Sequence, residues 1–295
     1  MYLLRCHCLS GNKLEQKLAI RIDDPPYYDG DKGVGETEHF LKLARENDAV
    51  LTLAIPMGRL QEWTHLQDDY LDLYKEGLLD PVCHGYYHED YAGTGGLDGA
   101  YLNEKMMKQE HGSQFKGLDI EDIGEVMGKC QDFAKEFFGQ KSDMWIAPFF
   151  REPGDKNRFG EILVENDYNS ISNLSVMDPL CASFIRGQHN GKDLYEVPFT
   201  IWIDAYERPL ASTRNLPHNP SLEDYVEATK EHIKFRFDRG LYVCILTHTT
   251  GFQKYPMKRF GYKGDNTAGR FFDTIYKWTR DEYPDAEFVG MKDLY

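Results

Sequence analysis

Short apolar runs alternate with amphipathic helical patterns along most of the chain. The apolar runs expected to form strands are Leu18–Ile22, Val50–Ile55, Leu79–Cys83, Met144–Phe149 and Leu241–Leu246, with Tyr168–Leu174 and Leu194–Phe199 also extended. The patterns expected to form helices are Thr37–Asn47, Leu66–Lys75, Leu118–Phe138, Lys156–Glu165, Ser221–Arg239 and Thr267–Arg280. Alternating strands and helices indicate parallel pairing through helical crossovers. Near-continuous apolar strands indicate burial on both faces of the sheet.

These strand–helix units follow one another without a linker, an internal repeat or a low-complexity segment. We therefore expect an α/β protein in which residues 1–295 form a single barrel domain, since α/β barrels of roughly 250 residues are common. A doubly wound open sheet is the alternative. No glycine-rich phosphate loop follows the first predicted strand, which weakens the nucleotide-binding version of that alternative.

The chain is acidic, with 49 Asp and Glu residues against 34 Lys and Arg residues and a net charge of −15. This balance argues against nucleic acid as a partner, because nucleic acid needs a basic face, and against an anionic membrane surface. No stretch reaches the ~20 apolar residues of a membrane span. The first ten residues lack the apolar run of a signal peptide. We expect a cytoplasmic protein with reduced thiols, since its six cysteines are scattered over a large chain. The oligomeric state stays unknown.

We expect catalytic residues directly after the predicted strands, because barrel enzymes carry their chemistry at the C-terminal ends of the strands. Asp23 and Asp24 follow the first strand, either as solvated acids in a turn or as a cation ligand beside a proton acceptor. His84 and His88 follow Leu79–Cys83, four residues apart. Such a pair can share one metal ion on a helical turn or on a tight loop. Imidazole with carboxylate suits Zn²⁺ or another borderline divalent ion.

Two further strand ends carry polar groups. Arg151 lies beside Glu152 after Met144–Phe149, where an arginine holds a carboxylate ionised and oriented. Gly154 leaves a backbone N–H open to a substrate oxygen. A surface loop with a salt bridge is the alternative for this segment. His248 closes the strand Leu241–Leu246 and is either a hydrogen-bonded core histidine or a catalytic acid.

The order of these four strand-end groups resembles the polysaccharide deacetylases, the NodB-homology carbohydrate esterases. The matching blocks are Ile22-Asp23-Asp24, His84-Gly85-Tyr86-Tyr87-His88, Phe150-Arg151-Glu152-Pro153 and Ile245-Leu246-Thr247-His248. The segment Leu194–Pro198 also resembles a Glu-x-Pro element of that family. The sequence departs from the family at Gly85, usually Ser or Thr, and at Gly154, usually aromatic. The fourth block is not recognisable, with Asn173 and Ser175, or Trp202 and Asp204, as loose candidates.

The resemblance implies a deformed (β/α)7-type barrel of the NodB-homology kind and a metal-dependent deacetylase. It implies one divalent metal, most simply Zn, with Co, Ni or Mn as alternatives. The residues and roles that it implies are metal ligands Asp24, His84 and His88, proton acceptor Asp23 held by Arg151, proton donor His248, and substrate-binding Gly154, Tyr87 and Trp202. The expected partner is a carbohydrate or a small amide substrate, with no nucleic acid and no membrane span.

Two other functions are consistent with the same residues. One is hydrolysis of another C–N amide bond, in a small non-sugar substrate, on the same barrel. The other is a non-catalytic carbohydrate-binding relative. The presence of Asp23 and His248 counts against the latter, because a binding module need not keep both a base and an acid.

Overall fold

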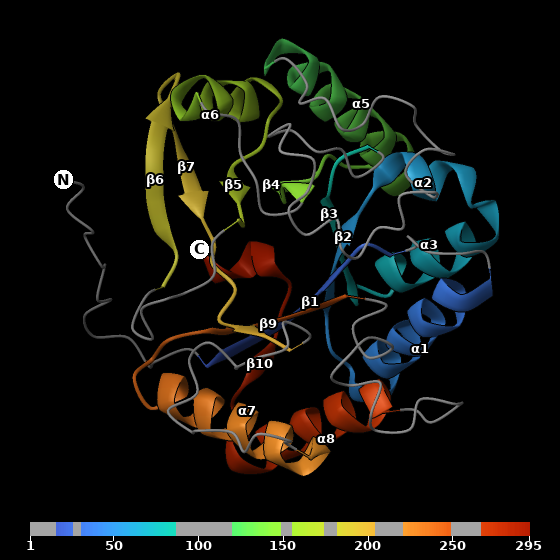
Figure 1. Cartoon of the computed structure of the whole chain (residues 1–295), viewed down its shortest axis with the longest axis vertical. Coiled ribbons are helices and arrows are strands. Elements are labelled where there is room, and N and C mark those ends of the chain that lie inside the picture. The colour runs from blue at the N-terminus through green and yellow to red at the C-terminus, as the bar shows by residue number, and fades with distance from the viewer. Residues whose placement is uncertain are drawn as a thin grey trace.

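A curled sheet of mainly parallel strands, surrounded by helices, forms the centre of the protein (Figure 1). The computed structural model describes residues 16–25, 31–86, 120–148, 155–173, 182–203, 221–248 and 267–295. Within these residues the hydrogen-bonded strand order is β6-β7-β5-β4-β3-β2-β1-β9-β8, and β10 pairs with β1. Every pairing is parallel except that of β6 with β7. The parallel α/β arrangement expected from the sequence is confirmed.

The strands are short, and most follow the predicted apolar runs. Their bounds are β1 Lys17–Asp23, β2 Leu51–Ile55, β3 Leu79–Cys83, β4 Met144–Trp145, β5 Ser170–Ile171, β6 Phe184–His189, β7 Lys192–Glu196, β8 Ile201–Trp202, β9 Val243–His248 and β10 Glu287–Phe288. The sheet curls because neighbouring strands twist in one direction.

The helices lie on the outside of the curled sheet (Figure 1). Their bounds are α1 Asp31–Asn47, α2 Met57–Glu62, α3 Gln67–Lys75, α5 Ile120–Phe138, α6 Lys156–Glu165, α7 Leu222–Phe237 and α8 Thr267–Glu282, with 3-10 turns η1 Thr64–Leu66 and η5 Met291–Leu294. Ser221 caps α7 as predicted. Its hydroxyl accepts from the N–H of Asp224, whose carboxylate accepts from the N–H of Ser221. None of the helices in the described ranges has the length and apolar character of a membrane crossing.

Strand β1 shows how the sheet separates two apolar layers. Leu18, Ile20 and Ile22 pack in the large cluster under the outer helices, whereas Ala19 belongs to the second cluster, inside the curl. Because side chains alternate along a strand, Arg21 and Asp23 share the inner face with Ala19. Both are fully buried. The inner face therefore carries polar groups at the C-terminal end of β1.

The C-terminal segment of the chain closes the opposite end of the curl. Met291 and Leu294 of η5 belong to the inner cluster. Asp80, near the start of β3, accepts hydrogen bonds from the hydroxyl of Thr52 and the N–H of Lys292. This polar contact joins η5 to two strands at their N-terminal ends.

Several of the described elements differ from the prediction, among them α1 and β6. The first described helix begins at Asp31, well before Thr37, even though Gly33 and Gly35 lower the helix propensity of its first turns. Strand β6 was not predicted, since all of its residues are partly or fully exposed and form no apolar run. It pairs antiparallel with β7 through a turn at Asn190 and Gly191, both with positive φ. Local sequence favours this turn, because Asn and Gly tolerate that conformation.

Candidate active site

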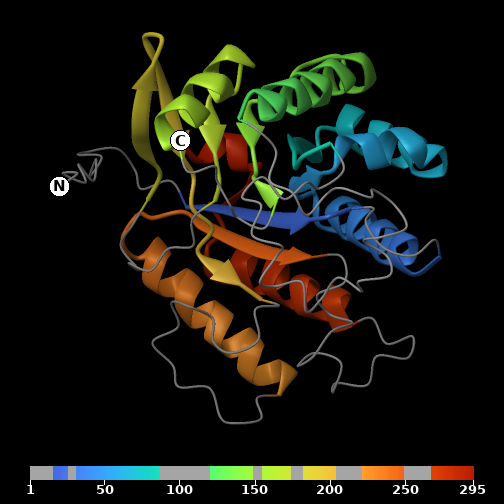
Figure 2. The same ribbon diagram turned by 45° about the horizontal axis from the view of Figure 1, so that its top comes forward.

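The predicted site residues of β1, β3 and β9 lie at the C-terminal ends of these neighbouring parallel strands. Asp23 is in register with Ala54 of β2 on one side and with His248 of β9 on the other. Figure 2 shows β1 and β9 running side by side in the same direction. His84 directly follows β3, and its backbone N–H donates to the carbonyl of Ile55 at 3.0 Å. The parallel topology thus gathers side chains that are far apart in sequence.

Asp24 turns the chain at the end of β1. Its φ is 65°, in the left-handed region that few residues other than glycine adopt. Its backbone N–H donates to the carbonyl of Ala54 at 3.2 Å. Only 7% of the residue is exposed. Unusual backbone conformations persist where the surrounding structure fixes them, and they concentrate at functional sites.

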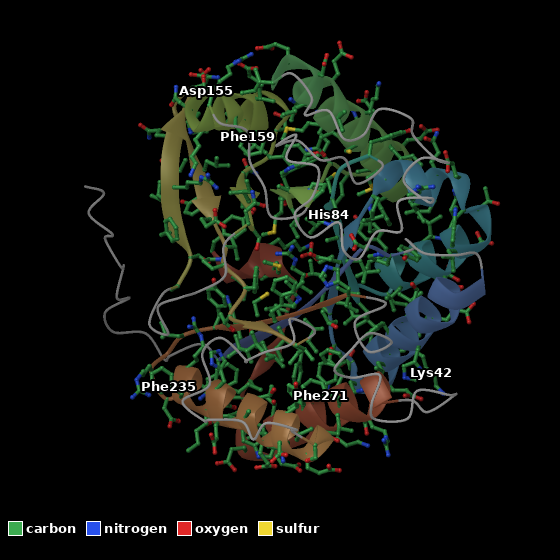
Figure 3. The ribbon with its side chains drawn as sticks, viewed as in Figure 1. Lys42, His84, Asp155, Phe159, Phe235 and Phe271 are labelled. Atoms are coloured by element: carbon green, nitrogen blue, oxygen red, sulfur yellow. The ribbon has the colours of Figure 1, made fainter. Side chains whose placement is uncertain are left out.

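His84 is buried and faces Asp24. Its Nδ1 lies 2.9 Å from the carbonyl oxygen of Ile146, and its Nε2 lies 3.1 Å from Oδ1 of Asp24. A carbonyl oxygen can only accept, so Nδ1 carries a proton. Neutral His84 therefore turns the lone pair of Nε2 toward the lone pairs of a carboxylate. That contact is favourable with a cation between the two atoms or with a proton shared by the ring and the carboxyl group. Figure 3 labels His84 inside the ring of helices.

The loop after His84 is bent as its glycine suggests. Gly85 has a φ of 74°. The carbonyls of Gly85 and Tyr86 accept from the N–H groups of Met57 and Gly58 in the first turn of α2. The hydroxyl of Tyr86 donates to the side chain of Gln61. Helix α2, which was not predicted, therefore fixes Gly85 and Tyr86, the residues that directly follow His84.

His248 lies on the other side of Asp24. Its Nε2 is 3.9 Å from Oδ2 of Asp24, beyond hydrogen-bond distance, and its side chain is 22% exposed. The ring of Trp202 from β8 lies 6.0 Å from the ring of His248, centroid to centroid, at an angle of 40°. Trp202 also packs edge-on against Phe199. The predicted substrate-binding residue Trp202 therefore lies beside the predicted proton donor.

Asp23 is held by an arginine that the sequence analysis did not single out. Nε and Nη2 of Arg21 donate to Oδ1 and Oδ2 of Asp23, each at 2.6 Å. Both side chains are buried. The signal was present in the sequence. Arg21 is a charged residue inside an apolar strand, and residues two apart on a strand share a face.

A cysteine inside the curl is unsuited to nucleophilic chemistry. Burial raises the pKa of the Cys244 thiol to about 12, with a further rise from Asp23 and opposing effects of Arg21 and Arg236. The thiol is the weaker nucleophile, since the thiolate is the reactive form. Among the described cysteines, Cys83 and Cys244 are free, and both are buried, as is Cys130.

The residues at the end of β1 and after β3 fit a divalent metal ion. Zinc bonds of about 2.0–2.2 Å to nitrogen and oxygen place two ligand atoms about 2.8–3.6 Å apart for angles between 90° and the tetrahedral angle. The 3.1 Å from Nε2 of His84 to Oδ1 of Asp24 lies in this range. A backbone carbonyl on the other ring nitrogen is a common way to orient a metal-binding histidine.

The metal site as expected needs a third ligand. Among the described residues, no group of three or more His, Cys, Asp and Glu side chains is placed to hold a metal ion. The third predicted ligand, His88, lies outside these residues, as do Arg151, Gly154 and Tyr87. Of the loose candidates for the fourth block, Ser175 and Asp204 also lie outside them, while Asn173 accepts from the N–H of Ala147 through its Oδ1.

Comparison with known proteins identifies the architecture. No protein-family model matches the chain, and no curated protein matches its sequence. Among solved structures, a protein from Mycobacterium smegmatis assigned to the polysaccharide deacetylases has a TM-score of 0.62 at 13% identity, over 97% of this chain and 91% of the other. The chain has the polysaccharide deacetylase fold. The deformed barrel implied by the sequence resemblance is thereby confirmed.

The same fold carries more than one function. The PuuE allantoinase has a TM-score of 0.60 at 14% identity, over 94% of this chain and 88% of the other. A CE4 family pseudoenzyme from Bacillus anthracis has a TM-score of 0.52 at 10% identity, over 95% of this chain and 65% of the other. The deacetylase fold therefore does not by itself decide the reaction, and the side chains at the strand ends must carry that argument.

Proposed function

We propose that this protein is a metal-dependent hydrolase that removes the acetyl group from an N-acetylated sugar or glycan intermediate. The observation that carries the proposal is the pair of contacts made by His84. Its Nδ1 is hydrogen-bonded to the carbonyl oxygen of Ile146, and its Nε2 faces the buried carboxylate of Asp24 at 3.1 Å. Such an arrangement suits a cation held between imidazole and carboxylate.

In this proposal Asp24, His84 and His88 hold one divalent ion, with zinc as the first candidate because the ligands are imidazole and carboxylate. When bound, such an ion polarises an acyl carbonyl and lowers the pKa of water toward about 7. Gly154 offers its backbone N–H to the acyl oxygen, and Tyr87 and Trp202 bind the sugar ring. The position of Trp202 beside His248 supports its part of this assignment.

Asp23 and His248 divide the proton transfers between them. Asp23 takes one proton from the attacking water, whose oxygen forms the new bond to the acyl carbon. The C–N bond then breaks, and His248 gives its proton to the leaving amine. The products are acetate and a free amine, and both residues return to their starting states by exchange with solvent. Two residues are needed because a base and an acid have opposite protonation states at one pH.

Two alternatives share the same site. Hydrolysis of a small C–N amide is supported by the allantoinase that has this fold. A non-catalytic role is supported by the pseudoenzyme that has it. The contacts of Asp23 with Arg21 and the nearness of His248 to Asp24 favour an enzyme over a binding protein, since binding alone does not require these groups together.

The test is release of acetate from N-acetylated oligosaccharides by the purified protein as isolated, after chelation, and after chelation with zinc restored. We expect acetate and free amine in equal amounts, loss of release on chelation, and recovery with zinc. The His248→Ala variant serves as the inactive control. Hydrolysis of allantoin without acetate release from any sugar would favour the small-amide alternative. Sugar binding without hydrolysis of either substrate would favour the non-catalytic one.

A further inference from the structure

Arg21 lies on the inner face of strand β1, two residues before Asp23, and all three of its side-chain nitrogens donate hydrogen bonds. Nε and Nη2 bind the two oxygens of Asp23, each at 2.6 Å. Nη1 binds Ser172 through both the carbonyl oxygen, at 3.1 Å, and the hydroxyl, at 3.0 Å. The side chain is completely buried. This fork fixes the plane of the Asp23 carboxylate as well as its position.

Within the described part of the chain, Arg21 also has apolar neighbours. The ring of Phe199 lies 5.6 Å from the guanidinium carbon, and the β9 residue in register with Arg21 is the buried Leu246. An apolar residue at this position would leave Asp23 buried without its ion-pair partner, and removal of one member of a buried pair is strongly destabilising. The role of Arg21 therefore lies in its effect on Asp23.

The anchor of Arg21 is itself fixed by neighbouring strands. The N–H of Ser172 donates to the carbonyl of Trp145 at the end of β4. The N–H of Asn173 donates to the buried carboxylate of Glu196 at 2.9 Å, and Glu196 also accepts from Arg186. The Glu-x-Pro element noted in the sequence thus holds the segment to which Arg21 is bound.

We infer that Arg21 is a positioning residue of this site. Its fork, fixed to the end of β5 through Ser172, sets the orientation in which Asp23 accepts the proton of the attacking water. The inference rests on the proposed function, because it concerns the step assigned there to Asp23. Arg21 belongs to the same strand as Asp23, and it acts on the reaction only through Asp23.

The test compares kcat and KM for acetate release, metal content and melting temperature in Arg21→Met, Arg21→Lys, Asp23→Asn and the double variant Arg21→Met/Asp23→Asn. We expect Arg21→Met to lower kcat about 100-fold, the effect typical of a misplaced reacting group, with KM within about threefold and metal retained. Arg21→Lys recovers part of kcat, since an ammonium cannot bind both oxygens as a fork does. The double variant is no slower than Asp23→Asn alone.

Two further variants separate positioning from stability. Arg236 is also completely buried, but it lies on α7 and binds the carbonyl of Tyr242 before β9. Arg236→Lys lowers the melting temperature and leaves kcat within about twofold. Ser172→Ala removes one hydrogen bond of Arg21 and lowers kcat a few-fold in the wild-type background but not in Arg21→Met. This milder variant keeps the test decisive where Arg21→Met folds poorly.

The inference would be overturned if the double variant lost kcat by the full product of the two single losses. It would also be overturned if Arg236→Lys lost as much kcat as Arg21→Met. An unchanged kcat in Arg21→Met beside an active wild-type protein would overturn the inference while leaving the proposed function intact. Absence of turnover in the wild-type protein with metal bound would overturn the proposed function and the inference together.

Discussion

His84 and His248 lie on opposite sides of Asp24 and differ in what they contact. His84 is 3.1 Å from one carboxylate oxygen and is fixed by Ile146, whereas His248 is 3.9 Å from the other oxygen and is partly exposed. The first distance suits a shared metal ion. The second is beyond hydrogen-bond distance.

This difference predicts different metal contents for two alanine variants that both lose turnover. His248→Ala lowers kcat by about 10²–10⁴-fold, the range for loss of a general acid, and keeps its metal. His84→Ala loses both turnover and metal. The measurement is kcat together with metal content for each variant. His232→Ala, at a buried histidine on the outer helix α7, is the matched control and keeps metal and most turnover. Unchanged turnover in either site variant refutes its assigned role.

At this scale the sequence predicted the chemical types better than the contacts. The adjacent acids at 23 and 24 were recognised, because they follow an apolar run at a strand end. Their different orientations were not predictable from composition. Asp24 has a φ of 65°, which turns its carboxylate toward His84 while Asp23 stays on the strand face with Arg21. The fork from Arg21 depends on a strand register that a single sequence does not display.

Between β3 and η5 lies a buried carboxylate that is not part of the site, that of Asp80. Burial raises the pKa of Asp80, against the opposing effects of Lys292 and the hydrogen bond from Thr52. A carboxyl group whose folded pKa is raised binds its proton more tightly in the folded state. Its contribution to stability is therefore complete at low pH and is lost as the pH rises from its unfolded pKa through its folded pKa.

We accordingly expect Asp80→Asn to gain stability relative to the wild-type protein as the pH rises from about 4 toward neutrality. The gain is at most about 1.4 kcal/mol per pH unit, the limit for one proton. Urea unfolding at several pH values measures it. Asp167→Asn is the control of opposite sign, because the hydrogen bond from Lys141 lowers the pKa of Asp167. A difference between Asp80→Asn and wild type that does not change with pH contradicts this account.

The elements that the sequence did not predict have a common physical cause. Strand β6 lies at one end of the strand order and is partly exposed, so it lacks the apolar run of a strand buried on both faces. Helix α2 is six residues long and directly follows Pro56, too short for a helical period to emerge. The central strands and long helices were predictable because burial imposes a pattern on them.

At the scale of the whole molecule, the curled parallel sheet is what makes the site possible. It brings the ends of β1, β3 and β9 together, and it places Trp202 of β8 beside His248. The opposite end is filled by η5, whose Met291 and Leu294 pack in the inner cluster. One end of the curled sheet is therefore filled by apolar side chains, and the other end carries the polar residues of the candidate site.

A metal ion held by Asp24 and residues after β3 joins separate strands, so it should stabilise the folded molecule. With free zinc at 100 times its Kd, binding adds about 2.7 kcal/mol. For a chain of this size that raises the melting temperature by roughly 5–10 °C. Asp24→Ala abolishes the shift. Asp167→Ala keeps it and is a matched control, since Asp167 also has a φ of 64° but lies outside the site. An equal shift in Asp24→Ala and wild type places the zinc elsewhere.

The most direct test of the central claim is elemental analysis of the purified protein beside its His84→Ala variant. The account predicts about one divalent transition-metal ion per wild-type chain, and none in the variant when both are purified alike. A wild-type protein that binds no divalent ion, even after incubation with zinc, would mean that the contact between His84 and Asp24 is a buried ion pair and that the proposed hydrolysis is wrong.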